Sequence, residues 1–116
     1  MQIQLYGLKR CRKTQRAISW LMEKNIPFEF HDLIRPGVSA EKISGWENTA
    51  GYLQVLDTGR TAFKKLAPKV KAAIKGGPET LKLLLGEPRL IRRPVLETAD
   101  VLLLGFDEAA YVKALL

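Results

Sequence analysis

Hydrophobic and polar residues alternate at the start of the chain and then change to a helical spacing. Gln2–Tyr6 alternate as in a short strand, with Ile3 and Leu5 between polar neighbours. After a turn at Gly7–Arg10, apolar residues recur at intervals of three and four, at Ile18, Leu21 and Met22. The pattern predicts a strand, a loop and a helix that begins at Arg12.

The middle of the chain has a helical pattern. Phe28–Leu33 alternate as a second strand, Ile34–Val38 form a loop, and Ser39 is a suitable N-cap for a helix that reaches Trp46 or Glu47. From there to Glu87 we expect only helices. Their breaks are predicted at the turn-forming and helix-ending residues Gly51, Asp57–Gly59, Pro68 and Gly76–Pro78, with Pro78 at the first position of the next helix.

The end of the chain predicts a β-hairpin and a last helix. Pro94–Glu97 and Val101–Leu104 are short apolar segments joined by a turn at Thr98–Asp100, and a helix follows from Asp107 to about Leu115. The order β-α-β, helical block, β-β-α is that of a thioredoxin-like fold with a four-stranded mixed sheet. We expect one α/β domain over residues 1–116, with its thioredoxin-like part at about 1–34 and 88–116 and a helical insertion at about 35–87.

The composition is that of one folded domain, since 47% of the 116 residues are hydrophobic. No apolar run is long enough to cross a membrane, and Met1 leads directly into a strand, so we expect no signal peptide and a cytoplasmic location. The 19 Lys and Arg residues against 12 Asp and Glu favour an anionic ligand or an acidic partner. These cations are not interleaved with aromatic residues, so we expect no direct nucleic-acid binding.

The single cysteine, Cys11, is the candidate reactive residue. It excludes an internal disulfide framework, and it precedes the first residue of a predicted helix, where backbone N–H groups have no intrahelical partner. With Arg12 and Lys13 directly after it, its thiolate is favoured by the helix dipole and by cations. We therefore expect a nucleophilic thiol, with Arg12 and Lys13 among the substrate-binding residues.

Several segments together resemble the ArsC/Spx family of arsenate reductase-like proteins, and within it the YffB-type members with one cysteine. The resemblance covers essentially the whole chain, and its most specific part is Cys11 combined with the segment Leu90–Leu96. The other matching segments are Leu5–Gly7, Trp20–Leu21, Phe28–Asp32, Gly37–Glu41, Asp57–Leu66 and Gly105–Glu108 with Tyr111.

The resemblance implies roles for three residues. Cys11 corresponds to the family nucleophile, which attacks an oxyanion or a mixed disulfide. Arg93 corresponds to an arginine that points into the anion site, where a guanidinium holds an oxyanion or carboxylate through paired hydrogen bonds; a solvated arginine at the end of a strand is the alternative. Pro94 corresponds to a cis-proline that faces the cysteine.

The chain also departs from the family pattern. The segment Asp57–Thr61 has glycine and arginine exchanged relative to the family, so Arg60 reaches the anion site only if it does so from the neighbouring position. The third arginine of the true arsenate reductases is absent after Gly105, and Thr14 replaces the second cysteine of the redox-sensing members. For Thr14 two interpretations stay open: a residue of the first helical turn, or a hydroxyl that donates to the thiolate.

Other residues are interpreted as structural. We expect His31 to be a satisfied histidine of a strand, Trp20 and Trp46 to be core residues, and the lysines between 64 and 75 to form a solvated helical face. No metal-ligand spacing and no nucleotide-binding glycine loop is present.

Two functions from different classes remain. The first is a monomeric, glutathione-dependent thiol reductase of arsenate reductase type, acting on a small oxyanion or a glutathione mixed disulfide. It has no bound cofactor, and an external thiol, glutathione or a glutaredoxin, resolves the Cys11 adduct because no second cysteine exists. The second is a Spx-like regulator that binds the RNA polymerase α subunit, for which Gly51 matches a small residue of the family's partner surface. The missing second cysteine favours the reductase.

Overall fold

The computed structural model describes residues 2–116, which divide into two compact units. One unit contains the residues up to Pro36 together with Arg93–Leu116, and the other contains Gly37–Arg92.

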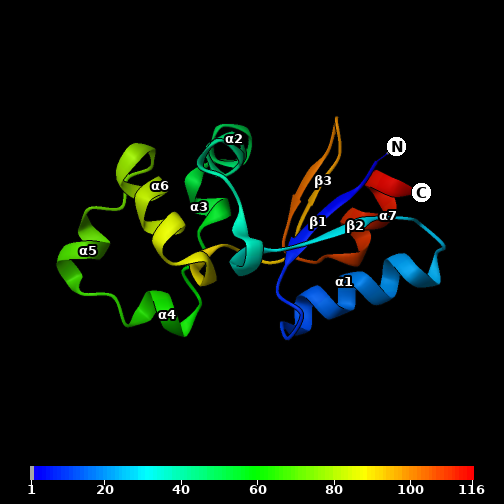
Figure 1. Ribbon diagram of the computed structural model, residues 1–116, viewed down its shortest axis with the longest axis horizontal. Coiled ribbons are helices and arrows are strands. Elements are labelled where there is room, and N and C mark those ends of the chain that lie inside the picture. Colours follow the sequence, from blue (N-terminus) through cyan, green and yellow to red (C-terminus); the bar gives the residue numbers. More distant parts are fainter. Residues whose placement is uncertain (1) are drawn as a thin grey trace. The chain divides into compact units, whose positions relative to one another are not determined.

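The first unit is built on a mixed four-stranded sheet. Its strands are β1 (Gln4–Gly7), β2 (Glu29–Asp32), β3 (Val95–Glu97) and β4 (Leu102–Leu104), and their order across the sheet is β2-β1-β3-β4 (Figure 1). β1 is parallel to β2, and β3 is antiparallel to both β1 and β4. The predicted β-α-β and β-β-α segments therefore meet in one thioredoxin-like sheet, as the sequence indicated.

Two helices cover the apolar face of this sheet. They are α1 (Arg12–Glu23) and α7 (Glu108–Leu115), and Asp107 caps α7 by accepting a hydrogen bond from the Ala109 N–H at 3.1 Å. Strand and helix residues share one buried cluster, which consists of Ile3, Leu5, Ala17, Trp20, Leu21, Leu96 and Tyr111. Burial of this cluster is the main force that holds the helices on the sheet.

The second unit is helical. It contains α2 (Ala40–Ala50), α3 (Tyr52–Val55), α4 (Thr61–Lys64), α5 (Pro68–Ala72), α6 (Gly77–Gly86) and a 3₁₀ turn, η2 (Pro88–Leu90). The helix α2 contacts α3 and α6, and its Ile43 and Trp46 are buried. Ser39 caps α2 by accepting a hydrogen bond from the Lys42 N–H at 3.1 Å, as predicted.

Some predicted boundaries were wrong. β1 includes Gly7 and starts at Gln4, because it pairs with β2 from that residue onward. The helix α2 continues to Ala50 and ends where Gly51 adopts a φ of 90°, a conformation that glycine adopts without strain. The predicted break at Pro68 is confirmed, because α4 ends at Lys64 and Pro68 is the first residue of α5.

The predicted loop after β2 is a π-type turn, η1 (Leu33–Gly37), that contains a cis Arg35–Pro36 peptide. The Asp32 carboxylate accepts hydrogen bonds from the N–H groups of Ile34 and Arg35 at 2.8 and 3.0 Å. These bonds lower the pKa of Asp32, because they stabilise its charged form.

Candidate thiol site

Cys11 is the N-cap residue of α1. Its backbone is extended, its N–H donates to the Leu8 carbonyl at 2.9 Å, and its carbonyl accepts the first helical hydrogen bond from the Gln15 N–H at 2.9 Å. The residue is half-buried. The sequence-based position of Cys11 at the start of the helix is confirmed.

Two side chains of α1 hold the loop that carries Cys11. The hydroxyl of Thr14 accepts a hydrogen bond from the Leu8 N–H at 3.4 Å, and Gln15 Nε2 donates to the Lys9 carbonyl at 2.8 Å. Thr14 is completely buried. These contacts support the structural interpretation of Thr14, and a hydrogen bond from its hydroxyl to a thiolate stays a prediction.

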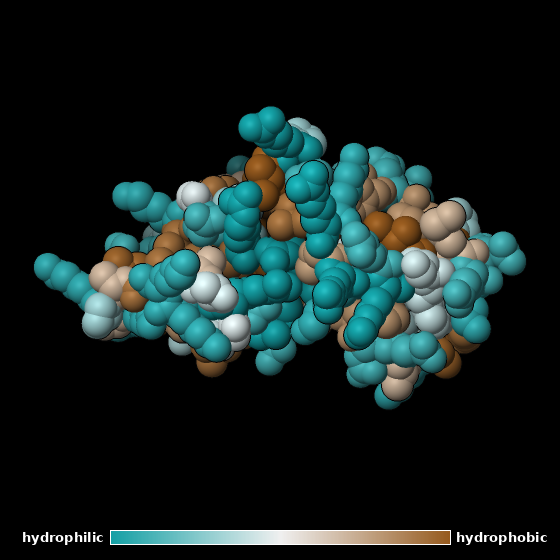
Figure 2. Space-filling view, turned by 90° about the horizontal axis from the view of Figure 1, so that it is seen from below, coloured by the Kyte–Doolittle hydropathy of each residue, from teal (hydrophilic) through white to brown (hydrophobic). Residues whose placement is uncertain are grey.

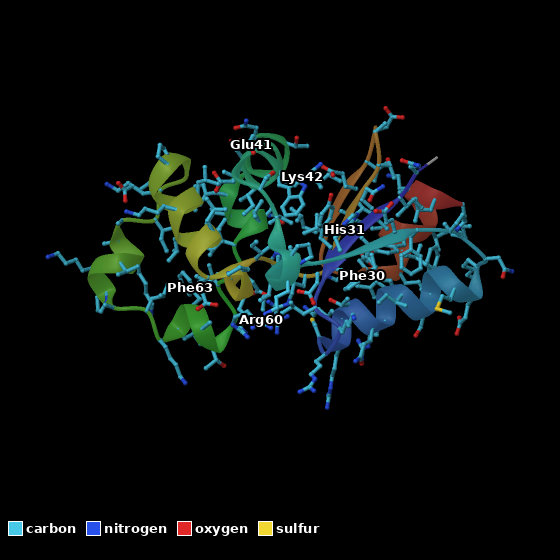
Figure 3. All side chains as sticks on the ribbon, in the orientation of Figure 1. Phe30, His31, Glu41, Lys42, Arg60 and Phe63 are labelled. Carbon is cyan, nitrogen blue, oxygen red and sulfur yellow. The ribbon has the colours of Figure 1, made fainter. Side chains whose placement is uncertain are left out.

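Positive charge surrounds this end of α1. Arg12 and Lys13 are exposed, as are three further cations nearby in the sequence, Lys9, Arg10 and Arg16, and the first turn of α1 contains no acidic residue. Figure 3 shows long side chains with nitrogen tips extending from this end of the helix, and Figure 2 shows hydrophilic side chains over much of the face seen from below. Helix dipole and side chains therefore both favour an anion at Cys11.

The Arg93–Pro94 peptide is cis, as predicted from the family resemblance. Pro94 directly precedes β3, and Val95 pairs with Tyr6 of the antiparallel β1. β1 therefore ends, and β3 begins, at the same end of the sheet. The loop that carries Cys11 leaves from this end, so the fold brings the cysteine loop and the cis-proline to the same end of the sheet.

Arg93 is buried, with only 6% of its surface exposed. This burial rules out the alternative of a solvated arginine at the end of a strand. A guanidinium that is removed from water inside a small domain requires polar or anionic groups around it. The burial is consistent with the role that the resemblance assigns to Arg93.

Arg60 lies in the helical unit, where it is the N-cap of α4 (Figure 3). Its Nε donates to the Asp57 carboxylate at 3.1 Å, and the other oxygen of that carboxylate accepts a hydrogen bond from the Gly59 N–H at 3.1 Å. The segment Asp57–Arg60 is thus a turn closed by its own side chains. The role of Arg60 as a second anion ligand stays a prediction.

Arg92 has a structural role that the sequence did not reveal. Its Nε donates to the Gln54 carbonyl at 2.8 Å and its Nη2 to the Leu56 carbonyl at 3.3 Å, while its backbone N–H donates to the Val55 carbonyl at 2.7 Å. Arg92 therefore ties the segment after η2 to α3. In an extended segment, successive side chains point to opposite sides. This alternation indicates that Arg92 and Arg93 face opposite sides, but it does not say which arginine faces which side.

The residues interpreted as structural have structural contacts. The His31 ring stacks on Tyr6 with ring centroids 4.7 Å apart, and its Nε2 is hydrogen-bonded to the Gln4 side chain. Trp20 and Trp46 are buried, with 5% and 1% exposed. Within residues 2–116, no helix is long and apolar enough to cross a membrane.

The mixed four-stranded sheet with its helices is a thioredoxin-like fold, in which Cys11 lies at the start of α1 and the cis Arg93–Pro94 peptide lies directly before β3. The ArsC family model matches residues 6–114, and the chain belongs to the ArsC family. The family predicted from the sequence is thus confirmed.

Solved structures and curated relatives agree with this assignment. The structure of a protein named YFFB is 35% identical, covers 98% of this chain and 99% of its own, and superposes with a TM-score of 0.92. An arsenate reductase (ArsC) related protein from Brucella melitensis is 32% identical, with coverages of 97% and 93% and a TM-score of 0.78. The regulatory protein MgsR of Bacillus subtilis is 26% identical over 97% of this chain and 89% of its own.

Proposed function

We propose that this protein is an arsenate reductase-like thiol oxidoreductase that uses glutathione and a single nucleophilic cysteine. The observation that carries the proposal is that the Cys11 loop and the cis Arg93–Pro94 peptide lie at the same end of the sheet. The dipole of a 12-residue helix and several exposed cations stabilise a thiolate there. A glutathione-dependent reaction also suits the cytoplasmic location expected from the sequence.

The reaction is a pair of thiol–disulfide exchanges. The Cys11 thiolate attacks the glutathione sulfur of a mixed disulfide, a new sulfur–sulfur bond forms, and the other thiol leaves as a thiolate that takes up a proton. A second glutathione, as thiolate, attacks the glutathione sulfur of the adduct. Oxidised glutathione leaves, and Cys11 returns to the thiolate. A glutaredoxin thiol can replace the second glutathione in this step.

Two measurements test this proposal. Native protein treated with a glutathione mixed disulfide should gain one glutathione by mass spectrometry, and added glutathione should remove it; Cys11→Ser should do neither. The alkylation rate of Cys11 should have its midpoint below the pH of about 8.5 that is typical of a free thiol. A protein that forms no adduct, or whose thiol titrates at or above that value, would overturn the proposal.

A second candidate function is a Spx-like regulator that binds the RNA polymerase α subunit. It is favoured by relatives named global transcriptional regulator Spx, among them one from Lactococcus lactis that is 28% identical. Gly51 is exposed, and a side chain added there would meet nothing within 4 Å. Because Gly51 has a φ of 90°, Gly51→Arg also strains the backbone, so its fold is first compared with that of the native protein by circular dichroism. Purified α subunit should bind the native protein but not the folded Gly51→Arg variant, and no binding to the native protein would exclude this function.

A further inference from the structure

The charged residues on both sides of Cys11 in the chain are all basic. No Asp or Glu precedes Glu23, and residues 9–16 contain five cations. All five are exposed: Lys9, Arg10, Arg12, Lys13 and Arg16. Arg10 and Arg12 are the two covalent neighbours of Cys11, so positive charge lies directly beside the residue that carries the thiol.

Four of these cations are available for a partner. The fifth, Lys9, already acts on Asp32: hydrogen bonds from the Arg35 and Ile34 N–H groups are the main cause of the lowered pKa of Asp32, and the charge of Lys9 lowers it further. Among the residues that the structure describes, the other four side chains form no hydrogen bond and no ion pair. These four residues are called the basic rim: Arg10, Arg12, Lys13 and Arg16.

The basic rim is unfavourable for the helix that carries most of it. The N-terminus of a helix favours acidic side chains and disfavours cations. The first turns of α2, α6 and α7 each contain a glutamate, whereas the first turn of α1 contains no acidic residue. Arg12 and Arg16 are also four residues apart on one helix face, where like charges repel each other. An anionic partner relieves both effects, so the rim is better explained by binding than by the stability of α1.

The rim suits a partner with several carboxylates close to its own cysteine. A glutathionyl group has two carboxylates and one ammonium group, so its net charge of about −1 does not match four cations. Arg10, Arg12 and Lys13 lie within two residues of Cys11, which is at most about 7.6 Å between Cα atoms. In an extended peptide, residues within two positions of a cysteine lie at a similar distance from it, about 7 Å. Acidic residues at those positions therefore match the spacing of the rim.

We propose that the substrate is a glutathionylated protein whose modified cysteine is flanked by acidic residues, and that the basic rim binds this acidic segment. This inference rests on the proposed function, because it identifies the other half of the mixed disulfide. The Cys11 thiolate attacks the glutathione sulfur and forms a new sulfur–sulfur bond. The bond between glutathione and the substrate cysteine breaks, and the substrate cysteine leaves as a thiolate that takes up a proton.

The rim also assists the departure of such a thiol. Acidic neighbours disfavour the thiolate form of a cysteine, which makes it a poorer leaving group, and nearby cations offset this effect. The glutathione sulfur lies between Cys11 and the substrate cysteine, and the long stems of arginine and lysine span this gap. A free thiol such as glutathione has no cations of this kind, so acidic substrates gain most from the protein.

Three glutathionylated peptides of one sequence test the inference. In each, the two residues on either side of the cysteine are all glutamate, all glutamine or all lysine. The rate of glutathione transfer to Cys11 is divided by the rate of transfer to 2-mercaptoethanol, which corrects for the reactivity of each peptide. At low salt we expect the glutamate peptide to react about tenfold faster than the glutamine peptide, and the lysine peptide to be slowest. In about 1 M salt the differences should nearly vanish, because charges are screened within about 3 Å.

The double variant Arg12→Gln/Lys13→Gln separates binding of the substrate from reactivity of the thiol. A less reactive thiol slows the reaction with all three peptides equally, whereas a weaker rim lowers the ratio of the glutamate rate to the glutamine rate. We expect this ratio to fall from about ten to about three or less. Lys24→Gln/Lys113→Gln removes two exposed cations far from Cys11 in the sequence. This matched control should retain the native ratio.

The outcomes distinguish this inference from the proposed function. Native protein that takes up glutathione neither from the peptides nor from oxidised glutathione would overturn both. Native protein that reacts with oxidised glutathione but does not prefer the glutamate peptide would overturn the acidic substrate alone. A control variant whose ratio falls as far as that of Arg12→Gln/Lys13→Gln would do the same, because net charge and not the rim would then explain the preference.

Discussion

Gly7 lies directly against the side chain of Thr14: a Cβ added at Gly7 would come within 2.6 Å of both Thr14 Oγ1 and Cγ2. Gly7 ends β1, and Thr14 is in the first turn of α1, so this contact fixes how the strand passes into the helix that carries Cys11. The same threonine also accepts the hydrogen bond from Leu8. The glycine is therefore required by a close approach of strand and helix.

We expect Gly7→Ala to destabilise the protein by about 1–3 kcal/mol, because the added methyl group overlaps a fully buried side chain. Chemical denaturation measures the loss. In the double variant with Thr14→Ala, the added methyl group should cost much less, because the atoms that it meets are gone. Gly45→Ala, in the interior of α2 with nothing within 4 Å of the added group, is the control and should stabilise by about 0.5–1 kcal/mol. Equal effects of the alanine at positions 7 and 45 would contradict the close contact.

Reduction of arsenate is expected to be slower than disulfide exchange. Arsenate, like phosphate, carries about two negative charges at neutral pH, and the chain lacks the third family arginine, while Arg60 is already paired with Asp57. Each missing charge-assisted donor costs about 1.5–3 kcal/mol, which is roughly a ten- to hundredfold loss.

Parallel assays of arsenate reduction and glutathione disulfide exchange, with Cys11→Ser as the blank, compare the two reactions. Arg60→Ala should leave the disulfide exchange within about twofold of native, the change expected when one partly exposed charge is lost. Rapid arsenate turnover that disappears in Arg60→Ala would instead show that Arg60 is an anion ligand.

Glu47 should make the stability of the protein depend on pH. Burial raises the pKa of this carboxyl, although the Gly77 N–H donates to it at the start of α6, and its Oε1 has no hydrogen-bond partner in the described structure. The folded protein thus binds the Glu47 proton more tightly than the unfolded chain. The free energy of unfolding therefore decreases as the pH rises from the ordinary glutamate pKa through the raised one.

Glu47→Gln removes this penalty, because the amide has no charge to desolvate and its carbonyl oxygen can still accept the hydrogen bond from the Gly77 N–H. We expect its Tm at neutral pH to exceed the native value by about 2–4 °C, and the difference should vanish below the ordinary glutamate pKa. Glu41→Gln, an exposed residue in the first turn of the same helix, should slightly lower the Tm, because it loses a favourable interaction with the helix dipole. A gain for Glu47→Gln that persists unchanged in acid would refute the linkage.

Tyr111 contributes through its ring and not through its hydroxyl group. The residue is fully buried, its hydroxyl oxygen has no hydrogen-bond partner within residues 2–116, and burial raises its pKa. We expect Tyr111→Phe to stabilise the protein by about 1 kcal/mol, since an unsatisfied buried polar group is removed. Tyr111→Ala should cost about 3–5 kcal/mol. Denaturant titration measures the free energy of unfolding of both variants. A clear loss of stability in Tyr111→Phe would reveal a partner for the hydroxyl.

Local patterns in the sequence predicted the order of the elements and the place of the thiol. Alternation in Gln2–Tyr6, helical spacing in α1, the Ser39 cap and the breaks at glycine and proline are local signals, because each depends on residues within one turn or one strand. The position of Cys11 at the start of α1 followed from them. The cis state of Arg93–Pro94 came from the family resemblance, and local patterning gave no sign of the cis Arg35–Pro36 peptide.

Which polar residues are removed from water became visible only in the folded protein. It showed that Arg93 is buried while its neighbour Arg92 binds backbone carbonyls, that Thr14 packs against Gly7, and that Arg60 is paired with Asp57. These outcomes depend on the packing of strands and helices against one another and on turns closed by side chains. A polar side chain in a sequence pattern has the same appearance whether it meets water, a carbonyl or a carboxylate, so its role is fixed only when the chain around it is folded.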